Sequence, residues 1–231
     1  MFKKIKQFFR RNSLIKHYYG LNGLDKKLEK FVNRDNGFFV ELGANDGITQ
    51  SNTLFFEKSR KWRGVLIEPT PHNYLKCIEN RSKATKVFCN ACVSFDYTEK
   101  FVEIVYSNLM STPAGLESDI PDSKKNANAG LRFLNPGHVN FSFGAVARTL
   151  NSILIESDAP RLIDLLSLDV EGAEIEVLKG LDHNQFRFNF ICMECRNEEK
   201  TISYMNEIGY ELVCKISHFD LLFRNTNVNT N

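Results

Sequence analysis

The chain has 231 residues, of which 42% are hydrophobic, and this is enough to bury the core of one α/β domain. Its formal net charge of +2 is too close to neutral to indicate nucleic-acid binding, so we expect no nucleic-acid partner. No apolar run approaches the length of a transmembrane helix and the N-terminus lacks the pattern of a signal peptide, so we expect a cytoplasmic protein with reduced cysteines.

Residues 1–35 are expected to precede the main domain. Basic residues are concentrated within residues 1–19, where apolar residues such as Phe2 and Phe9 recur at close to helical spacing. A basic amphipathic helix of this kind either lies on the acidic inner face of a membrane or packs on the domain or a second subunit. We favour packing, because the segment is short, and we predict a helix over 24–32.

The most informative stretch is the apolar run that starts at Phe38 and leads into a short loop, Gly43–Gly47. A strand followed by such a loop is typical of a nucleoside cofactor site in a doubly wound α/β protein. The flanking acids Glu41 and Asp46 would repel the pyrophosphate of a dinucleotide, and the loop lacks the G-x-G-x-x-G spacing of nicotinamide enzymes. These acids suit hydroxyls, an ammonium and a sulfonium, and S-adenosylmethionine carries all three.

A second apolar run, Gly64–Ile67, ends at Glu68, one strand–helix–strand unit after Glu41. A carboxylate at this position accepts two hydrogen bonds from a ribose diol. Pro69 then turns the chain. The cofactor-binding residues predicted in these two blocks share one edge of the sheet; they are Glu41, Gly43, Ala44, Asn45, Asp46, Gly47, Glu68 and Pro69.

A third strand is predicted over Thr85–Val93, with Asn90 and Ala91 near its end. This end approaches the adenine in such folds, so we add both residues to the predicted cofactor site. Asn90 either hydrogen-bonds the adenine ring or caps a turn. A further strand or hairpin arm is predicted over Phe101–Tyr106.

Residues 107–143 have no periodicity and are rich in Ser, Asn, Gly and Pro. A long irregular loop in a compact domain either covers a binding site or is mobile surface. Its position before the fourth core strand makes it a candidate cover for the acceptor, with Arg132 and His138 as its polar side chains.

The fourth strand, Leu162–Val170, ends in acids, with Asp169 on the strand and Glu171 directly after it. The fifth strand, Phe188–Glu194, also ends in an acid. Further helices are expected over 53–59, 73–80, 174–181 and 203–208, the last two strands over 210–217 and 220–224, and a disordered tail over 225–231.

Three blocks of the chain resemble the FkbM family of S-adenosylmethionine-dependent methyltransferases. They are Val40–Gly47, Leu66–Pro69 with Tyr74, and Leu168–Glu174, and weaker matches are Thr149–Leu150 and Asp220–Phe223. The resemblance spans residues 36–224. It implies a single Rossmann-like class I methyltransferase domain of the α/β class. Its mostly parallel seven-stranded sheet would have a C-terminal antiparallel hairpin and helices on both faces. It also implies O-methylation, commonly of sugar hydroxyls or of other secondary-metabolite hydroxyls.

Methyl transfer needs the acceptor oxygen held behind the methyl group and its proton removed. Asp169 is the leading candidate for the base and also borders the expected cofactor site. Glu171 either orients the acceptor or caps the following helix. Glu194 either binds magnesium or manganese together with Asp169 and Asn197, or binds an acceptor hydroxyl or pairs with Arg196. We therefore assign catalytic roles to Asp169, Glu171 and Glu194.

The cysteines and histidines give weaker signals. Cys89 and Cys92, like Cys192 and Cys195, lie three apart in predicted strands and so point to opposite faces, which argues against a zinc site. No histidine has the spacing of a nucleophile or metal motif, and His138 and His218 are either structural or solvated side chains or alternative bases.

The sequence therefore predicts an S-adenosylmethionine-dependent O-methyltransferase whose acceptor is a hydroxyl, most commonly of a sugar in a glycan or glycoconjugate. The alternatives are a methyltransferase for a non-sugar small molecule and a binding protein that has lost catalysis. A nicotinamide oxidoreductase is disfavoured by the loop spacing.

Overall fold

The computed structural model describes residues 17–120, 122–134 and 139–227. Its main sheet has the strand order β10-β11-β9-β8-β1-β2-β3. These strands are β1 Phe38–Leu42, β2 Arg63–Ile67, β3 Lys86–Phe88, β8 Leu162–Leu168, β9 Arg187–Glu194, β10 Tyr210–Lys215 and β11 Asp220–Asn225. Adjacent strands pair in parallel except on both sides of β11. The predicted seven-stranded sheet with a C-terminal antiparallel hairpin is confirmed.

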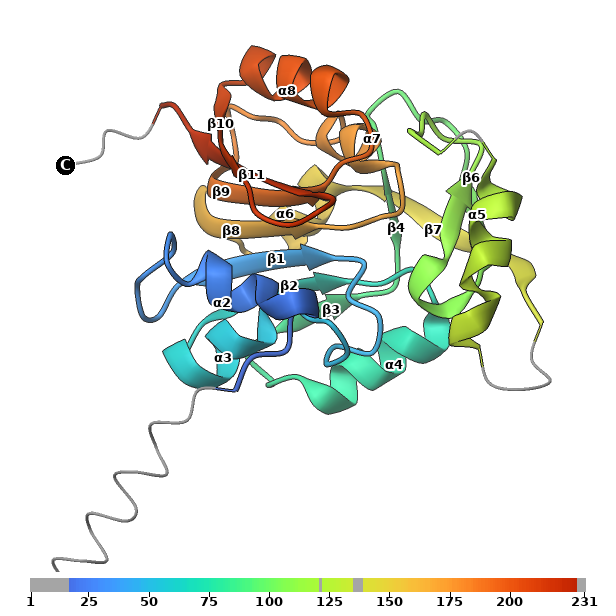
Figure 1. Cartoon of the computed structure of the whole chain (residues 1–231), viewed down its shortest axis with the longest axis horizontal. Coiled ribbons are helices and arrows are strands. Elements are labelled where there is room, and N and C mark those ends of the chain that lie inside the picture. Colours follow the sequence, from blue (N-terminus) through green and yellow to red (C-terminus); the bar gives the residue numbers. More distant parts are fainter. Residues whose placement is uncertain (1–16, 121, 135–138, 228–231) are drawn as a thin grey trace, which may run out of the picture.

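Helices cover both faces of this sheet, as predicted (Figure 1). One face carries α2 Leu24–Leu28, α3 Leu54–Arg60 and α4 Pro71–Asn80, and the other carries α6 Leu150–Glu156, α7 Glu174–Leu178 and α8 Glu198–Glu207. The central strands are apolar toward both layers, so Phe39 packs toward the first set and Val40 toward the second. Each fully buried side chain of this size contributes about 1.5–3 kcal/mol to stability.

The described part of the N-terminal segment packs on the domain. Tyr18 contacts Phe55 with ring centroids 4.6 Å apart, and Leu24 and Leu28 are buried in the core. The helix α2 is shorter than predicted and follows the 3₁₀ turn η1 Leu21–Gly23. Residues 1–16, which hold most of the basic segment, lie outside the described residues.

The prediction of one strand over Thr85–Val93 is wrong, because these residues are divided between two sheets. After β3 the backbone leaves the main sheet at Asn90, and β4 Ala91–Val93 joins a second sheet. The Asn90 side chain donates to the Val146 carbonyl at 3.1 Å, which ties this step to the neighbouring strand. The residues on both sides of Asn90 are apolar, so the sequence pattern resembles that of one strand.

The second sheet has the order β4-β7-β5-β6 and stands beyond the carboxyl ends of the main sheet (Figure 1). Its other strands are β5 Phe101–Tyr106, β6 Thr112–Ala114 and β7 Phe141–Thr149. The expectation of one long irregular loop over 107–143 is therefore wrong. This region also forms η2 Asn108–Met110, α5 Ser123–Ala129 and η3 Gly130–Phe133, and the Asp122 side chain caps α5 by accepting from the Lys125 amide.

The C-terminal part differs slightly from expectation. Asn225 belongs to β11 and is buried, so the strand includes the first residue of the predicted tail, and residues 228–231 lie outside the described part. The helix expected over 203–208 begins earlier, at Glu198. Among the described residues, no helix is both long and apolar enough to span a bilayer.

Candidate active site

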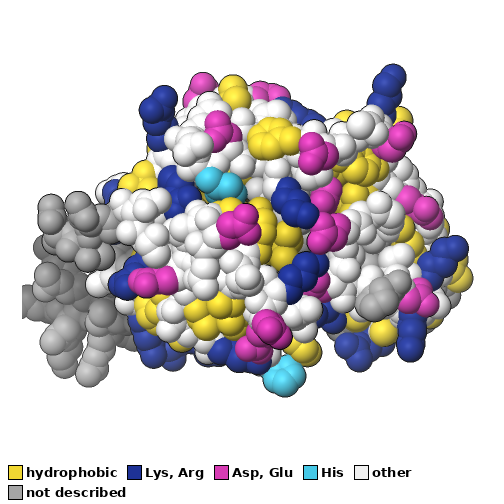
Figure 2. Space-filling model, turned by 90° about the horizontal axis from the view of Figure 1, so that it is seen from above, with side chains coloured by type: hydrophobic (Ala, Val, Ile, Leu, Met, Phe, Trp, Pro, Cys, Tyr) yellow, Lys and Arg dark blue, Asp and Glu magenta, His cyan; other side chains and the backbone are white. Residues whose placement is uncertain are grey.

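A pocket of about 150 Å³ opens at the carboxyl edge of the main sheet, where that edge meets the second sheet. Its walls come from the loop after β1, the ends of β2 and β8, the β3–β4 step and the second sheet. Figure 2 shows acidic and basic side chains gathered along the boundary between the body of the molecule and the lobe on its right. Ligands of parallel sheets bind at this edge.

The loop after β1 is held close to the end of β8. Gly43 has φ +74°, and a Cβ on it would lie 1.9 Å from the Asp169 carbonyl oxygen, so only glycine allows this approach. Asn45, at φ +49°, donates its amide to Glu68 at 2.9 Å, and its side chain accepts from Asn73 at 2.8 Å. Gly43, Ala44 and Asn45 all line the pocket.

Glu68 ends β2 inside the pocket wall and is buried. One carboxylate oxygen accepts from the Asn45 amide at 2.9 Å and the other from the Thr70 amide at 2.8 Å. Burial nevertheless raises the pKa of Glu68 to about 7. A ligand that donates hydrogen bonds to this carboxylate therefore binds better when Glu68 is ionised.

Glu41 reaches the same edge, but its carboxylate is used within the protein. It accepts from the Ser51 hydroxyl at 2.9 Å, from the Asn52 amide at 2.8 Å and from Arg81 at 3.3 Å. Arg81 is fully buried and also pairs with Glu57 at 3.1 Å. Glu41 therefore supports the pocket wall at Ser51 and Asn52, and it also lines the pocket as predicted for a cofactor-binding residue.

Asp46 and Gly47, which were also predicted to bind the cofactor, do not line the pocket. The Asp46 carboxylate accepts from the Thr49 amide at 2.7 Å and the Ile48 amide at 2.9 Å, and so closes its own turn. Partial burial raises the pKa of Asp46, but these hydrogen bonds outweigh burial and hold the pKa below its usual value. Gly47, at φ +79°, provides the turn beside Arg81.

The wall across from the glycine loop is mainly apolar and contains Pro69 and Ala91. Asn90 lines it too, and its side-chain nitrogen also donates to the Val146 carbonyl of β7. The 3₁₀ turn η2 closes this side through Asn108 and Leu109.

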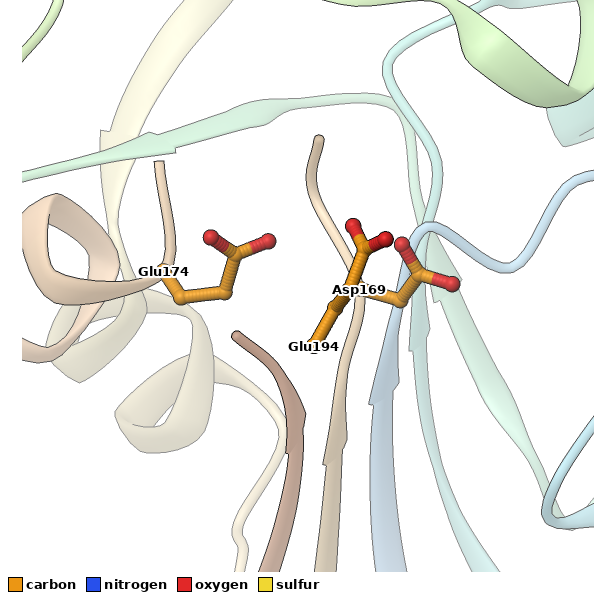
Figure 3. Close-up of side chains that lie close together, drawn as sticks. All are labelled: Asp169, Glu174 and Glu194. Carbon is orange, nitrogen blue, oxygen red and sulfur yellow. The ribbon is translucent and has the colours of Figure 1, made fainter. Parts of the chain in front are cut away.

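Three carboxylates converge at the ends of β8 and β9, as Figure 3 shows for Asp169, Glu174 and Glu194. One oxygen from each lies within 4.8 Å of the others. Asp169 is surrounded by protein, yet its side chain remains accessible from the pocket that it lines. Burial and the charge of Glu194 raise the pKa of Asp169 well above its usual value, and burial raises the pKa of Glu194 to about 8 and of Glu174 to about 7.

Glu171 completes this acidic end of the pocket. It has φ +55°, a strained conformation for a residue with a side chain, which is typical of functional sites. Its carboxylate accepts from Asn126 and from Arg196, both at 3.0 Å, and burial raises its pKa. Because the side chain is held in this way, the predicted alternative in which Glu171 caps the next helix is wrong.

The predicted pairing of Glu194 with Arg196 is confirmed at 3.3 Å, while the other Glu194 oxygen is buried without a protein partner. Asn197 accepts from the Lys200 amide at 3.1 Å and caps α8, so its side-chain oxygen is used by the helix, and its predicted role as a metal ligand stays a prediction. Glu174 lies where that ligand was expected. It was missed because an acid in the first turn of a helix usually stabilises the helix alone.

Asn52 is a second residue that the sequence did not reveal. Its side-chain nitrogen donates to the Ser167 hydroxyl at 3.1 Å. Its side-chain oxygen is buried in the pocket wall and has no hydrogen-bond partner among the described residues. A polar triplet before an apolar run indicates a helix cap, which hid this role. The oxygen is available to a donor on a ligand.

The histidines and cysteines lie outside this chemistry. His72 contacts the Tyr106 hydroxyl at 3.0 Å, and His183 contacts the Leu178 carbonyl. His218 is on the β10–β11 turn beside Phe219, and His138 lies outside the described residues. The six cysteines are free.

The sheet order, the glycine loop and the acid at the end of β2 define a class I, S-adenosylmethionine-dependent methyltransferase. The chain matches the model of the methyltransferase FkbM domain over residues 41–212, which is well over half of its length. It therefore belongs to the FkbM methyltransferase family.

Several of the solved structures that the chain matches are methyltransferases by name. They include the methyltransferase FkbM from Methylobacillus flagellatus KT (14% identity, 83% of this chain and 44% of that chain, TM-score 0.46). Others are a putative caffeoyl-CoA O-methyltransferase from Staphylococcus aureus (9%, 96% and 90%, 0.45) and precorrin-6y C5,15-methyltransferase from Geobacter metallireducens GS-15 (12%, 87% and 85%, 0.44). No curated protein sequence matches the chain.

The hydrogen-bond acceptors and apolar surface of the pocket fit S-adenosylmethionine. Glu68 offers acceptors to a ribose diol, and the wall with Pro69 and Ala91 suits an adenine. The unpartnered Asn52 oxygen and the Asp169 carboxylate suit an ammonium or a sulfonium. Because Gly43 has no Cβ, the loop can lie close to the Asp169 carbonyl oxygen at this end of the pocket.

Proposed function

We propose that the protein transfers a methyl group to a hydroxyl oxygen of a sugar in a glycan or glycoconjugate. The observation that carries the proposal is the convergence of Asp169, Glu171 and Glu194 at one end of the cofactor pocket. Carboxylates accept hydrogen bonds from hydroxyls, and an acceptor with several hydroxyls satisfies several of them at once. A non-sugar alcohol is the alternative substrate class.

Asp169 is the proposed base. When bound, S-adenosylmethionine would supply a methyl group on a sulfonium, and as the C–S bond broke its sulfur would leave as the neutral thioether of S-adenosylhomocysteine. As the acceptor oxygen forms its bond to carbon, its proton passes to the Asp169 carboxylate. Glu171 and Glu194, both held by Arg196, accept hydrogen bonds from neighbouring hydroxyls and fix the acceptor's orientation.

Calorimetric titration of the purified protein tests the cofactor, and transfer of labelled methyl to a panel of sugars and glycolipids tests the acceptor. We expect binding of S-adenosylmethionine and its demethylated product, no binding of NAD, and label on a sugar oxygen. Binding of NAD alone would overturn the assignment. Cofactor binding with transfer only to a non-sugar hydroxyl would replace the substrate class, and cofactor binding without transfer would favour a protein that has lost catalysis.

Cofactor affinity should depend on the ionisation of Glu68. Because the pKa of Glu68 in the free protein is about 7, the carboxyl group binds a proton below this pH and accepts hydrogen bonds less well. Affinity for S-adenosylmethionine should therefore rise roughly five- to tenfold from pH 6 to pH 7.5. Titrations at the two pH values measure this. Glu68→Gln should bind weakly at both, whereas Glu194→Gln should keep the dependence; a flat wild-type profile contradicts the prediction.

A divalent cation is a second component of the proposal. Asp169, Glu174 and Glu194 present hard oxygen ligands within 4.8 Å of one another, and the buried free oxygen of Glu194 lacks a partner. Such ligands suit magnesium or manganese. We expect a chelator to abolish methyl transfer, added magnesium to restore it, and magnesium to raise the melting temperature of the wild type but not of Glu194→Gln. Full activity in the chelator would show that Asp169 works without a metal.

We also propose that the protein is cytoplasmic and that it has no nucleic-acid partner. The support for this is the set of free cysteines and the near-neutral net charge. Contact of residues 1–19 with the inner face of a membrane would bring the protein to lipid-linked glycans, and sedimentation with anionic vesicles tests this contact.

A further inference from the structure

A row of aromatic side chains extends from the mouth of the pocket along the second sheet. Its members are His72, Tyr106, Phe141 and Phe143, which we call the aromatic row. Neighbouring ring centroids are 5.1 Å apart for His72 and Tyr106, 5.0 Å for Tyr106 and Phe141, and 6.1 Å for Phe141 and Phe143. Phe141 is 50% exposed, which is unusual for a phenylalanine within a strand.

The row lies on the face of the second sheet that forms the pocket wall. Phe143 pairs directly with Ile104 across β7 and β5, and Phe141 pairs with Tyr106. Directly paired residues share a face, and Ile104 lines the pocket. His72 joins the row from the start of α4, shortly after the pocket residue Pro69. The apolar wall of the pocket therefore continues outward as an open aromatic surface.

The row combines apolar ring faces with hydrogen-bonding edges. The Tyr106 hydroxyl and the His72 ring nitrogen lie 3.0 Å apart at one end, and Asn108 and Ser111 border the adjoining pocket wall. A pyranose ring matches this mixture, because one face carries only C–H groups while its equatorial hydroxyls point sideways. A purely apolar partner would leave the remaining hydrogen-bonding capacity of the His72–Tyr106 pair unused.

We propose that the aromatic row binds further sugar units of the acceptor, so that the substrate is an oligosaccharide chain rather than a free monosaccharide. This inference rests on the proposed function, and it extends the acceptor site beyond the acidic end of the pocket. One unit is methylated at the carboxylates, while the next units stack on the rings outside. Exposed apolar patches beside pockets commonly mark such binding surfaces.

Phe101 provides a matched control for Phe141. Both are phenylalanines of the same two paired strands and are about equally exposed, at 56% and 50%. Phe101 pairs with Val146. It is three residues from Ile104 along β5, and because side chains alternate between the two faces of a strand, Phe101 lies on the opposite face. Substitution of either residue removes the same surface-exposed ring, but only Phe141 belongs to the row.

The experiment applies the full chain, saturated with S-adenosylhomocysteine, to an array of pyranose mono- and oligosaccharides. We expect the wild type to bind oligosaccharides better than the matching monosaccharides. Phe141→Ala should lose about tenfold in apparent affinity, Phe141→Leu nearly as much, and Phe101→Ala less than twofold. Binding of no oligosaccharide, or an equal loss in Phe101→Ala, would overturn the proposal.

Two further readouts separate this proposal from the proposed function. Cofactor titration of each variant reports on the methyltransferase site alone and should be unchanged in Phe141→Ala. Light scattering should give the same mass for the wild type and Phe141→Ala, and a dimer that dissociates in the variant would assign the row to a subunit interface instead. Methyl transfer to a non-sugar hydroxyl without glycan binding would overturn the proposal that the aromatic row binds an oligosaccharide. It would leave the methyltransferase activity itself established.

Discussion

Replacing Asp169 by asparagine is expected to lower the rate of methyl transfer by roughly 10²- to 10⁴-fold, the usual contribution of a general base. Asparagine has nearly the same shape but cannot take the acceptor's proton. Asp169 directly follows β8 and lines the pocket, and its backbone lies against Gly43 of the glycine loop. The measurement is single-turnover transfer of labelled methyl with saturating cofactor, once an acceptor is in hand.

The cofactor affinity of Asp169→Asn should change less than about tenfold, because the ribose and adenine contacts remain. Glu198→Gln is the control, since Glu198 forms only an exposed pair with Lys215 and should keep the wild-type rate. A variant with full activity would remove Asp169 from the chemistry. A variant that lost cofactor binding and rate together would assign it to cofactor binding instead.

Replacing Arg81 by methionine is expected to lower the free energy of unfolding by about 3–5 kcal/mol, because it leaves buried carboxylates without a counter-charge. Arg81 is fully buried and pairs with Glu41 at 3.3 Å and with Glu57 at 3.1 Å. It also donates to the Thr53 hydroxyl at 2.9 Å. Urea denaturation measures the change, and cofactor affinity should fall with it, since Ser51 is held by the same network.

Arg224→Met is the matched control, because Arg224 pairs with Glu211 on the surface, where both side chains are about half exposed. We expect this variant to lose less than about 1 kcal/mol. Adding Glu41→Gln to Arg81→Met should recover part of the lost stability, since one unpaired buried charge is removed. Equal stability of Arg81→Met and wild type would contradict a role for this network.

Much of the cofactor site could be predicted from the sequence, because strand ends in a parallel sheet share one edge. An apolar run that stops at an acid locates that acid at the edge, and this placed Glu68 and Asp169 correctly. The same argument placed Glu41 at the edge, but it could not reveal that Arg81, far along the chain, occupies the Glu41 carboxylate.

The second sheet could not be predicted in the same way. The strand β4 has only three residues, and the single polar residue Asn90 is the only sequence signal for the change of sheet. The strand β7 follows a region rich in Asn and Gly and contains Gly144, which weakens its strand pattern. The roles of Asn52 and Glu174 depend on contacts with distant residues, and each has an ordinary local explanation as part of a helix start.

The two ends of the second sheet's segment lie side by side, since Ala91–Val93 pairs with Ala147–Thr149. One uninterrupted piece of chain, residues 91–149, therefore leaves and re-enters the methyltransferase body at a single place. Such a piece can be exchanged between relatives without rethreading the main sheet. Replacement of this segment would change the pocket wall that the second sheet provides, while the glycine loop, Glu68 and Asp169 on the main sheet would stay in place.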